Sequence, residues 1–165
     1  MKKIILLFAL LISTLTMSAQ QTSEKPYTYK QYGNTYVVSI ANHTDLAESI
    51  MTFCKDMKIT AGSITGIGAI NEATLRFYNP KTKQYVDKTF TEQMEVANLT
   101  GNVSVMNGET YTHLHCVLGR SDYSALAGHL LSAHLNGAGE IVITTFDSPM
   151  ERYHDEETGL NMYKF

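Results

Sequence analysis

Two histidines stand one residue apart in the stretch YTHLHCVLGR, which runs from Tyr111 to Arg120. The alternation of apolar and polar residues predicts a strand, in which successive side chains point to opposite faces. His113 and His115 then share one face, while Leu114 and Cys116 lie on the other. The two α-carbons would be about 6.5 Å apart, close enough for both imidazoles to converge on one metal ion at about 2.1 Å.

A catalytic type of zinc site needs a third protein ligand, and two later histidines are candidates. His129 follows a predicted turn at Gly119–Tyr123 that would fold the next segment back beside the first, and Gly128 gives the backbone room. His134 is the rival. If residues 129–135 form a strand, His129 and His134 point to opposite faces, so only one can share the site. Paired histidines also occur by chance on polar sheet faces. These residues alone therefore do not exclude that His113 and His115 are solvent-facing side chains that bind no metal.

Two further histidines are set aside, because His43 and His154 are predicted to lie in loops. Glu95 or Glu140 could supply a carboxylate ligand or a general base, and the spacing does not choose between them.

The elements that must position these residues are mostly strands. Residues 27–40 predict two short strands around the turn YGN, and Thr44 or Asp45 could cap a helix that runs to about Lys58. The helix is indicated by apolar residues at helical spacing, namely Leu46, Ile50, Phe53 and Met57. Many strands with one clear helix favour an α+β fold whose sheet is mostly antiparallel.

Glycines divide the rest of the chain in this interpretation. Gly62, Gly66 and Gly68 indicate a strand with a bulge or a close backbone approach, because the G-x-G-x-x-G of a phosphate loop is incomplete. Later strands should break at Gly101–Asn102 and at Asn107–Gly108. The remaining expectations are a hairpin across Asn79-Pro80-Lys81, two apolar segments at 128–135 and 139–146, and a polar turn with a short tail at 154–165.

Residues 1–20 have the pattern of a secretory signal peptide. MKK is a short basic start, IILLFALLISTLTM is a short apolar run, and SAQ supplies small residues before a polar segment. The apolar run is short for a membrane span and is interrupted by Ser and Thr. We expect cleavage near Ala19 or Gln20, export to the periplasm or the outside medium, and no membrane attachment afterwards. A short disordered segment, 21–26, would then precede one domain at 27–165.

The charge of the exported chain argues against nucleic acid as a partner. Without Lys2 and Lys3, two of the 13 basic residues, the chain keeps 16 acidic residues and a net charge of about −5. A duplex-binding protein gains affinity by neutralising phosphates with clustered Lys and Arg, and no basic run or stripe occurs here. Export permits a disulfide, but we interpret Cys54 and Cys116 as two separate buried thiols.

Several blocks together resemble one known family. GSITGIGAINEATLRFY, EVANLTGNV, HLHCVLG and AGHLL, in this order and spacing, resemble the plant and prokaryote conserved (PPC, or PCC) domain. The resemblance runs from about Tyr27 to TGLNMY near the end. Two departures are Ala127, where the family often has a second glycine before the third histidine, and the lack of the Arg-Gly-Arg-rich AT-hooks of plant members. The hooks make the DNA contacts, so a DNA-binding role transfers poorly.

The resemblance implies a fold, an assembly and a ligand set. It implies an α+β fold with an antiparallel sheet, one or two helices and a homotrimeric assembly, and a likeness to the zinc enzyme acetolactate decarboxylase. That enzyme holds its metal with an HxH pair and a later histidine. By position these are His113, His115 and His129, so the resemblance favours His129 over His134. The cofactor would be zinc or another divalent metal, because imidazole suits several ions.

Two classes of function follow from these expectations. The first is an exported metal-binding homotrimer that could act as an enzyme on a small oxygenated molecule. Glu95 or Glu140 would then transfer protons, and Glu95 is preferred because it begins the block EVANLTGN. The second is a non-catalytic binding or assembly module with structural histidines. DNA binding, which the family name suggests, ranks last.

Overall fold

The computed structural model describes residues 25–165. The signal peptide predicted at 1–20, and most of the segment 21–26, lie outside these residues. Among residues 25–165, no helix has both the length and the apolar character needed to span a membrane.

The first elements form a hairpin and a helix. Strands β1 (Tyr27–Tyr32) and β2 (Thr35–Ile40) pair antiparallel, and helix α1 (Leu46–Asp56) follows. Asp45 is the N-cap, and its Oδ1 accepts a hydrogen bond of 2.8 Å from the backbone N–H of Glu48. The helix ends at Asp56, slightly earlier than predicted, because Lys58 has a φ of 53° and turns the chain away.

Four long strands build the body of the sheet. They are β3 (Gly62–Asn79), β5 (Met94–Met106), β6 (Glu109–Gly119) and β7 (Ala125–Thr145). β3 pairs with β5 and β7, and β6 pairs with the same two strands, so the four pairings close a ring. β2 continues the sheet beyond β7. The β3–β5, β3–β7 and β5–β6 pairings each contain register shifts, at which a β-bulge bends the strand.

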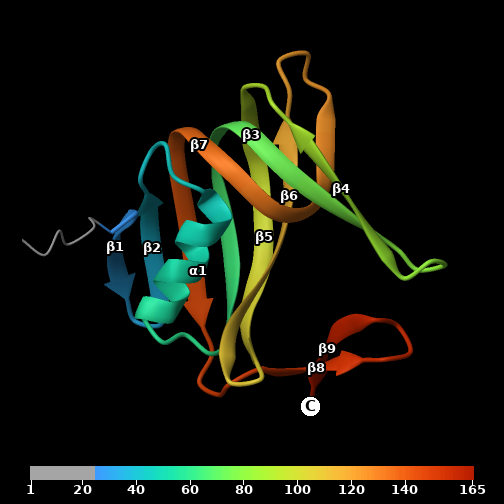
Figure 1. Cartoon of the computed structure of the whole chain (residues 1–165). Helices are drawn as coiled ribbons and strands as arrows, with labels where there is room; N and C mark the ends of the chain where they lie inside the picture. Colours follow the sequence, from blue (N-terminus) through green and yellow to red (C-terminus); the bar gives the residue numbers. More distant parts are fainter. Residues whose placement is uncertain (1–24) are drawn as a thin grey trace, which may run out of the picture.

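Two arms project from this ring (Figure 1). The first is formed by the end of β3 with β4 (Gln84–Phe90), and the second is the hairpin of β8 (Glu151–Asp155) and β9 (Leu160–Lys164). The C-terminal hairpin pairs with β5 in parallel through only two residues, Glu151 and Arg152. The arms also meet, because the Tyr78 hydroxyl donates to the carbonyl of Thr158 and the Lys83 ammonium donates to that of Glu156 at 3.1 Å.

Three predictions about element boundaries were wrong. β5 runs unbroken through Gly101 and Asn102, and β7 runs unbroken through Gly137 and Gly139. The tail predicted after residue 154 is a hairpin, which places His154 in β8 rather than in a loop. In each strand the glycines allow close packing instead of ending the element. A β-carbon on Gly137 in β7, for example, would lie 2.7 Å from the β-carbon of Ala69.

The core lies between helix α1 and the sheet (Figure 1). The helix buries its apolar stripe, including Leu46, Ile50 and Phe53, against β2, β6 and β7. Cys54 and Cys116 are both buried and both free, as predicted. One helix among residues 25–165, on a sheet that is antiparallel except for the β5–β8 pairing, confirms the predicted α+β class.

Candidate metal centre

The candidate site forms where β7 changes partners. His113 and His115 extend from the same face of β6, and His129 on β7 is the register partner of His115. At His129 β7 leaves β6 and continues along β3, where its register partner is Arg76. The turn between the strands is closed by a 2.9 Å hydrogen bond from the backbone N–H of Arg120 to the carbonyl of Ser124. The predicted fold-back therefore exists and brings the third histidine beside the first two.

The three imidazoles converge. Their ring centroids are 5.1 Å apart for His113 and His115, 5.0 Å for His113 and His129, and 5.3 Å for His115 and His129. One ligand nitrogen from each ring lies within 4.8 Å of the others. The Nε2 atoms of His113 and His115 are 3.2 Å apart. Two nitrogens bound tetrahedrally to zinc are separated by about 3.3 Å, so the donor set fits such an ion.

The electrostatics favour the neutral form of two of the rings, those of His113 and His129. Burial, together with the neighbouring His129 and His115 and the charge of Arg152, lowers the pKa of His113 to about 4. Burial and His115 also lower the pKa of His129. A neutral imidazole has the free lone pair that a metal requires, because a protonated ring donates from both nitrogens and cannot coordinate.

Two arginines flank the histidines, and sequence reasoning found neither. The Arg152 guanidinium is buried and donates from Nη2 to the Asn102 side-chain oxygen at 2.9 Å, and Asn102 is the register partner of His113. On the other side, Arg76 makes a two-point ion pair with Asp87 at 2.7 and 2.8 Å. Arg76 lies in one of the blocks that carry the family resemblance, but neither arginine was singled out, because each comes beside the histidines only through contacts that are distant in sequence.

The two glutamates proposed for proton transfer lie elsewhere. Glu95 is the register partner of Gly119, four residues along β6 from His115, which is a separation of about 13 Å on the strand rise. Glu95 and Glu140 line one shared hollow on the outer face of the sheet. Neither reaches an ion held by the three histidines of the same chain, and the catalytic role of Glu95 stays a prediction.

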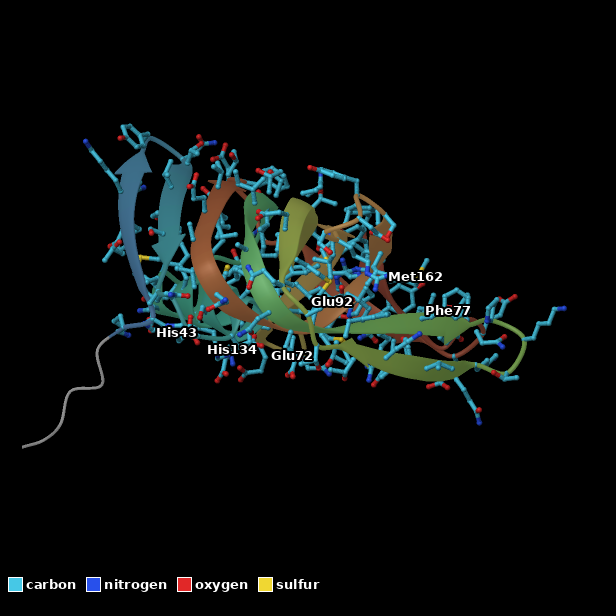
Figure 2. All side chains as sticks on the ribbon, turned by 90° about the horizontal axis from the view of Figure 1, so that it is seen from above. His43, Glu72, Phe77, Glu92, His134 and Met162 are labelled. Carbon is cyan, nitrogen blue, oxygen red and sulfur yellow. The ribbon has the colours of Figure 1, made fainter. Side chains whose placement is uncertain are left out.

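The other histidines are also apart from the cluster. The prediction that His129 and His134 point to opposite faces was wrong, because a register shift between Thr74 and Leu75 of β3 adds one residue to β7 and returns both histidines to the same face of the sheet. His134 lies five residues further along β7, as the register partner of Glu72. Its ring stacks beside that of His43, with centroids 6.4 Å apart, and Figure 2 shows His43, Glu72 and His134 along one edge of the molecule. His154 lies on β8, where its Nδ1 is 3.1 Å from the side-chain oxygen of Asn161.

Gly101 lets β5 approach β6 directly behind the site. A β-carbon at Gly101 would lie 2.1 Å from the backbone oxygen of His113. We expect Gly101→Ala to separate the strands, to lower the free energy of unfolding by about 1–3 kcal/mol, and to weaken metal binding through displacement of His113. Denaturant unfolding and metal titration measure both effects. Gly119→Ala is the matched control on β6, because its nearest neighbours would be 3.9 Å away, and equal effects in the two variants would contradict the argument.

The fold and the histidine cluster define a small α+β domain with a candidate three-histidine metal centre. The chain belongs to the Plants and Prokaryotes Conserved (PCC) domain family, whose model matches residues 27–147. The resemblance deduced from the sequence blocks is thereby confirmed. A search of curated proteins finds no match.

Solved structures similar to this chain include three of particular interest. A protein of Bacteroides thetaiotaomicron, described as a candidate DNA-binding protein, is 58% identical with a TM-score of 0.84, over 85% of this chain and 98% of its own. A metal-containing protein of Archaeoglobus fulgidus is 30% identical with a TM-score of 0.75, over 86% and 100% of the two chains. A plant- and prokaryote-conserved protein of Pyrococcus horikoshii is 24% identical with a TM-score of 0.74, over 84% and 94%, and supports the fold alone.

Proposed function

We propose that this chain is an exported homotrimer that binds one divalent metal ion per subunit, zinc or another, through His113, His115 and His129. The observation that carries the proposal is the convergence of three ligand nitrogens within 4.8 Å from two strands. The metal-containing description of the 30% identical Archaeoglobus fulgidus protein adds support. Three neutral ligands leave a position open, where a bound ion can polarise a carbonyl or acidify a water.

Metal content tests the proposal directly. The mature chain, purified without a histidine tag, should retain close to one divalent ion per subunit after dialysis, measured by mass spectrometry. Removal of the ion by a chelator should lower the melting temperature, because an ion that binds only the folded chain stabilises it. A chain that stays metal-free after incubation with zinc, cobalt and nickel would instead support a non-catalytic binding or assembly module.

The proposed trimer has a candidate contact face on the outside of the sheet. Val37 and Val142 are register partners, and their side chains are 45% and 39% exposed. Together with Ile67, which is 53% exposed, they border a hollow of about 370 Å³. Exposed apolar patches of this kind mark association surfaces. A second copy of the chain is the occupant that the family resemblance implies.

A charge on this face should prevent association. We expect Ile67→Glu to turn a trimer into monomers at micromolar concentration, because the contact would bury an unpaired carboxylate. Sedimentation velocity measures the change. Phe165→Glu, at a fully exposed terminal residue, should leave the assembly intact, and a trimeric Ile67→Glu variant would exclude this face as the contact.

DNA binding is the less favoured function. The Bacteroides thetaiotaomicron protein carries a DNA-binding description, but the sequence here has 16 acidic and 13 basic residues and a net charge of −3. We expect no salt-sensitive duplex binding by the mature chain in a mobility-shift assay at physiological salt. Tight binding that weakens steeply with added salt would reverse this ranking.

A further inference from the structure

With a divalent ion bound, the candidate metal centre would carry excess positive charge. Its three ligands are neutral imidazoles, and no carboxylate joins the ligand cluster among residues 25–165. A divalent ion held there keeps its full charge, unlike an ion in a site with aspartate or glutamate ligands. Arg76 is largely neutralised by its two-point pair with Asp87, whereas Arg152 has no carboxylate among its hydrogen-bond partners.

Arg152 is held rigidly at the edge of this centre. Its Nε donates to the Ser104 hydroxyl at 2.8 Å and its Nη1 donates to the carbonyl of Asn161 at 2.6 Å. The guanidinium lies between two rings, 5.1 Å from the centroid of Tyr111 and 4.1 Å from that of Tyr163. A buried cation fixed in this way acts through a low-dielectric surrounding, so its charge is felt more strongly than that of a surface lysine.

The guanidinium and the imidazoles are separated by one layer of side chains. Asn102 accepts from Arg152 and is the register partner of His113, and paired residues on one sheet face lie about 5 Å apart. Tyr111, which stacks on Arg152, extends from the same face of β6 two residues before His113.

A cavity next to the site has room for a small organic molecule. It has a volume of about 500 Å³ and is bordered by His129 and Tyr111. Apolar side chains form much of its wall, including Met51, Leu130 and Leu131. Asp45 and Glu48 also line it, but both carboxylate oxygens of Asp45 already accept backbone hydrogen bonds, from Glu48 and Ala133.

We infer that the metal centre takes a small carboxylic acid with a short apolar tail, whose carboxylate occupies the open metal position and is selected by the charge of Arg152. This inference rests on the proposed metal site and adds the class of its ligand. Arg152 is a positioning and selectivity residue here. It lies in the C-terminal hairpin, beyond residues 27–147, the part matched by the family model.

Butanoate and its neutral isostere butanamide are the matched probes. The protein is loaded with cobalt, its metal content is measured, and each probe is titrated while the visible spectrum of the ion is followed. We expect butanoate to bind at least about tenfold more tightly than butanamide, because charge-assisted contacts are about twice as strong as neutral ones. Equal affinities for the two probes in the wild-type chain would overturn the inference without any variant.

Three variants assign the preference to Arg152. Arg152→Gln should lose most of the butanoate preference and keep the butanamide affinity, whereas Arg152→Lys should retain most of it. Lys164→Gln removes a charge from an exposed residue of the same hairpin and should change nothing. Equal losses in Arg152→Gln and Lys164→Gln, or equal losses in Arg152→Gln and Arg152→Lys, would contradict the assigned role.

The same experiment separates the two levels of the proposal. A chain that holds cobalt but binds both probes alike refutes the ligand class and leaves the metal site standing. A chain that holds no cobalt refutes the metal site and the ligand class together.

Discussion

Replacement of His129 by alanine should empty the metal centre. The variant keeps only His113 and His115, both from β6, and loses the ligand that β7 brings across the strand pairing. Substitutions that merely disturb the support of a metal ligand cost about 10–100-fold in affinity, so loss of a ligand itself should cost more than about 100-fold. The measured content should fall from about one ion per subunit to nearly none after dialysis.

His134→Ala is the matched control for this experiment. It removes an exposed histidine from the same strand, but one that faces His43 rather than the cluster. Its metal content should equal that of the wild-type chain. If the His129→Ala variant retains its ion, or if both variants lose it equally, the three-histidine site is wrong.

Replacement of Phe53 by alanine should produce the largest loss of stability among the substitutions considered. Phe53 is fully buried, and its ring packs edge-on against three tyrosine rings at centroid distances of 5.0, 5.2 and 5.4 Å. These rings belong to Tyr27, Tyr29 and Tyr36, so Phe53 joins α1 to the first hairpin. The lost burial and the remaining cavity should lower the free energy of unfolding by about 3–5 kcal/mol.

Chemical denaturation measures this effect, and Phe165→Ala is its control. The Phe165 side chain is fully exposed, so its removal should change the stability by less than about 0.5 kcal/mol. Phe53 is on the helix and does not contact the histidine rings, so the folded fraction of Phe53→Ala should bind metal normally. If the free energy of unfolding of Phe53→Ala falls by less than about 1 kcal/mol, the packing of the helix against the first hairpin contributes little to stability, contrary to this prediction.

The convergence of the two candidate ligands on β6 could be predicted from alternation alone, because a strand places residues two apart on one face. His129 could not be chosen this way. Its place beside His115 depends on the register between β6 and β7, which is set by the turn at Arg120–Ser124 and not by a pattern in either strand. The resemblance to a known family supplied that choice, and the geometry agrees with it.

Glycine was the main source of error in the fold. Gly101 and Gly137 were interpreted as ends of strands, yet both lie inside long strands where neighbouring chains come very close. A sequence pattern does not distinguish a glycine that ends a strand from a glycine that lets a neighbouring strand approach closely. Arg152 could not be identified from the sequence either, because its hydrogen-bond partners Ser104 and Asn102 are about 50 residues earlier in the chain.

The contact between the two projecting arms has a consequence for dissecting the protein into fragments. A fragment cut after residue 147, where the family match ends, would delete the hairpin that accepts hydrogen bonds from Tyr78 and Lys83. The β3–β4 arm would then lose its brace, and Arg76 and Asp87, which it carries beside His129, would become more mobile. Boundaries taken from the shared domain alone would thus yield a shorter chain with a looser rim around its histidines.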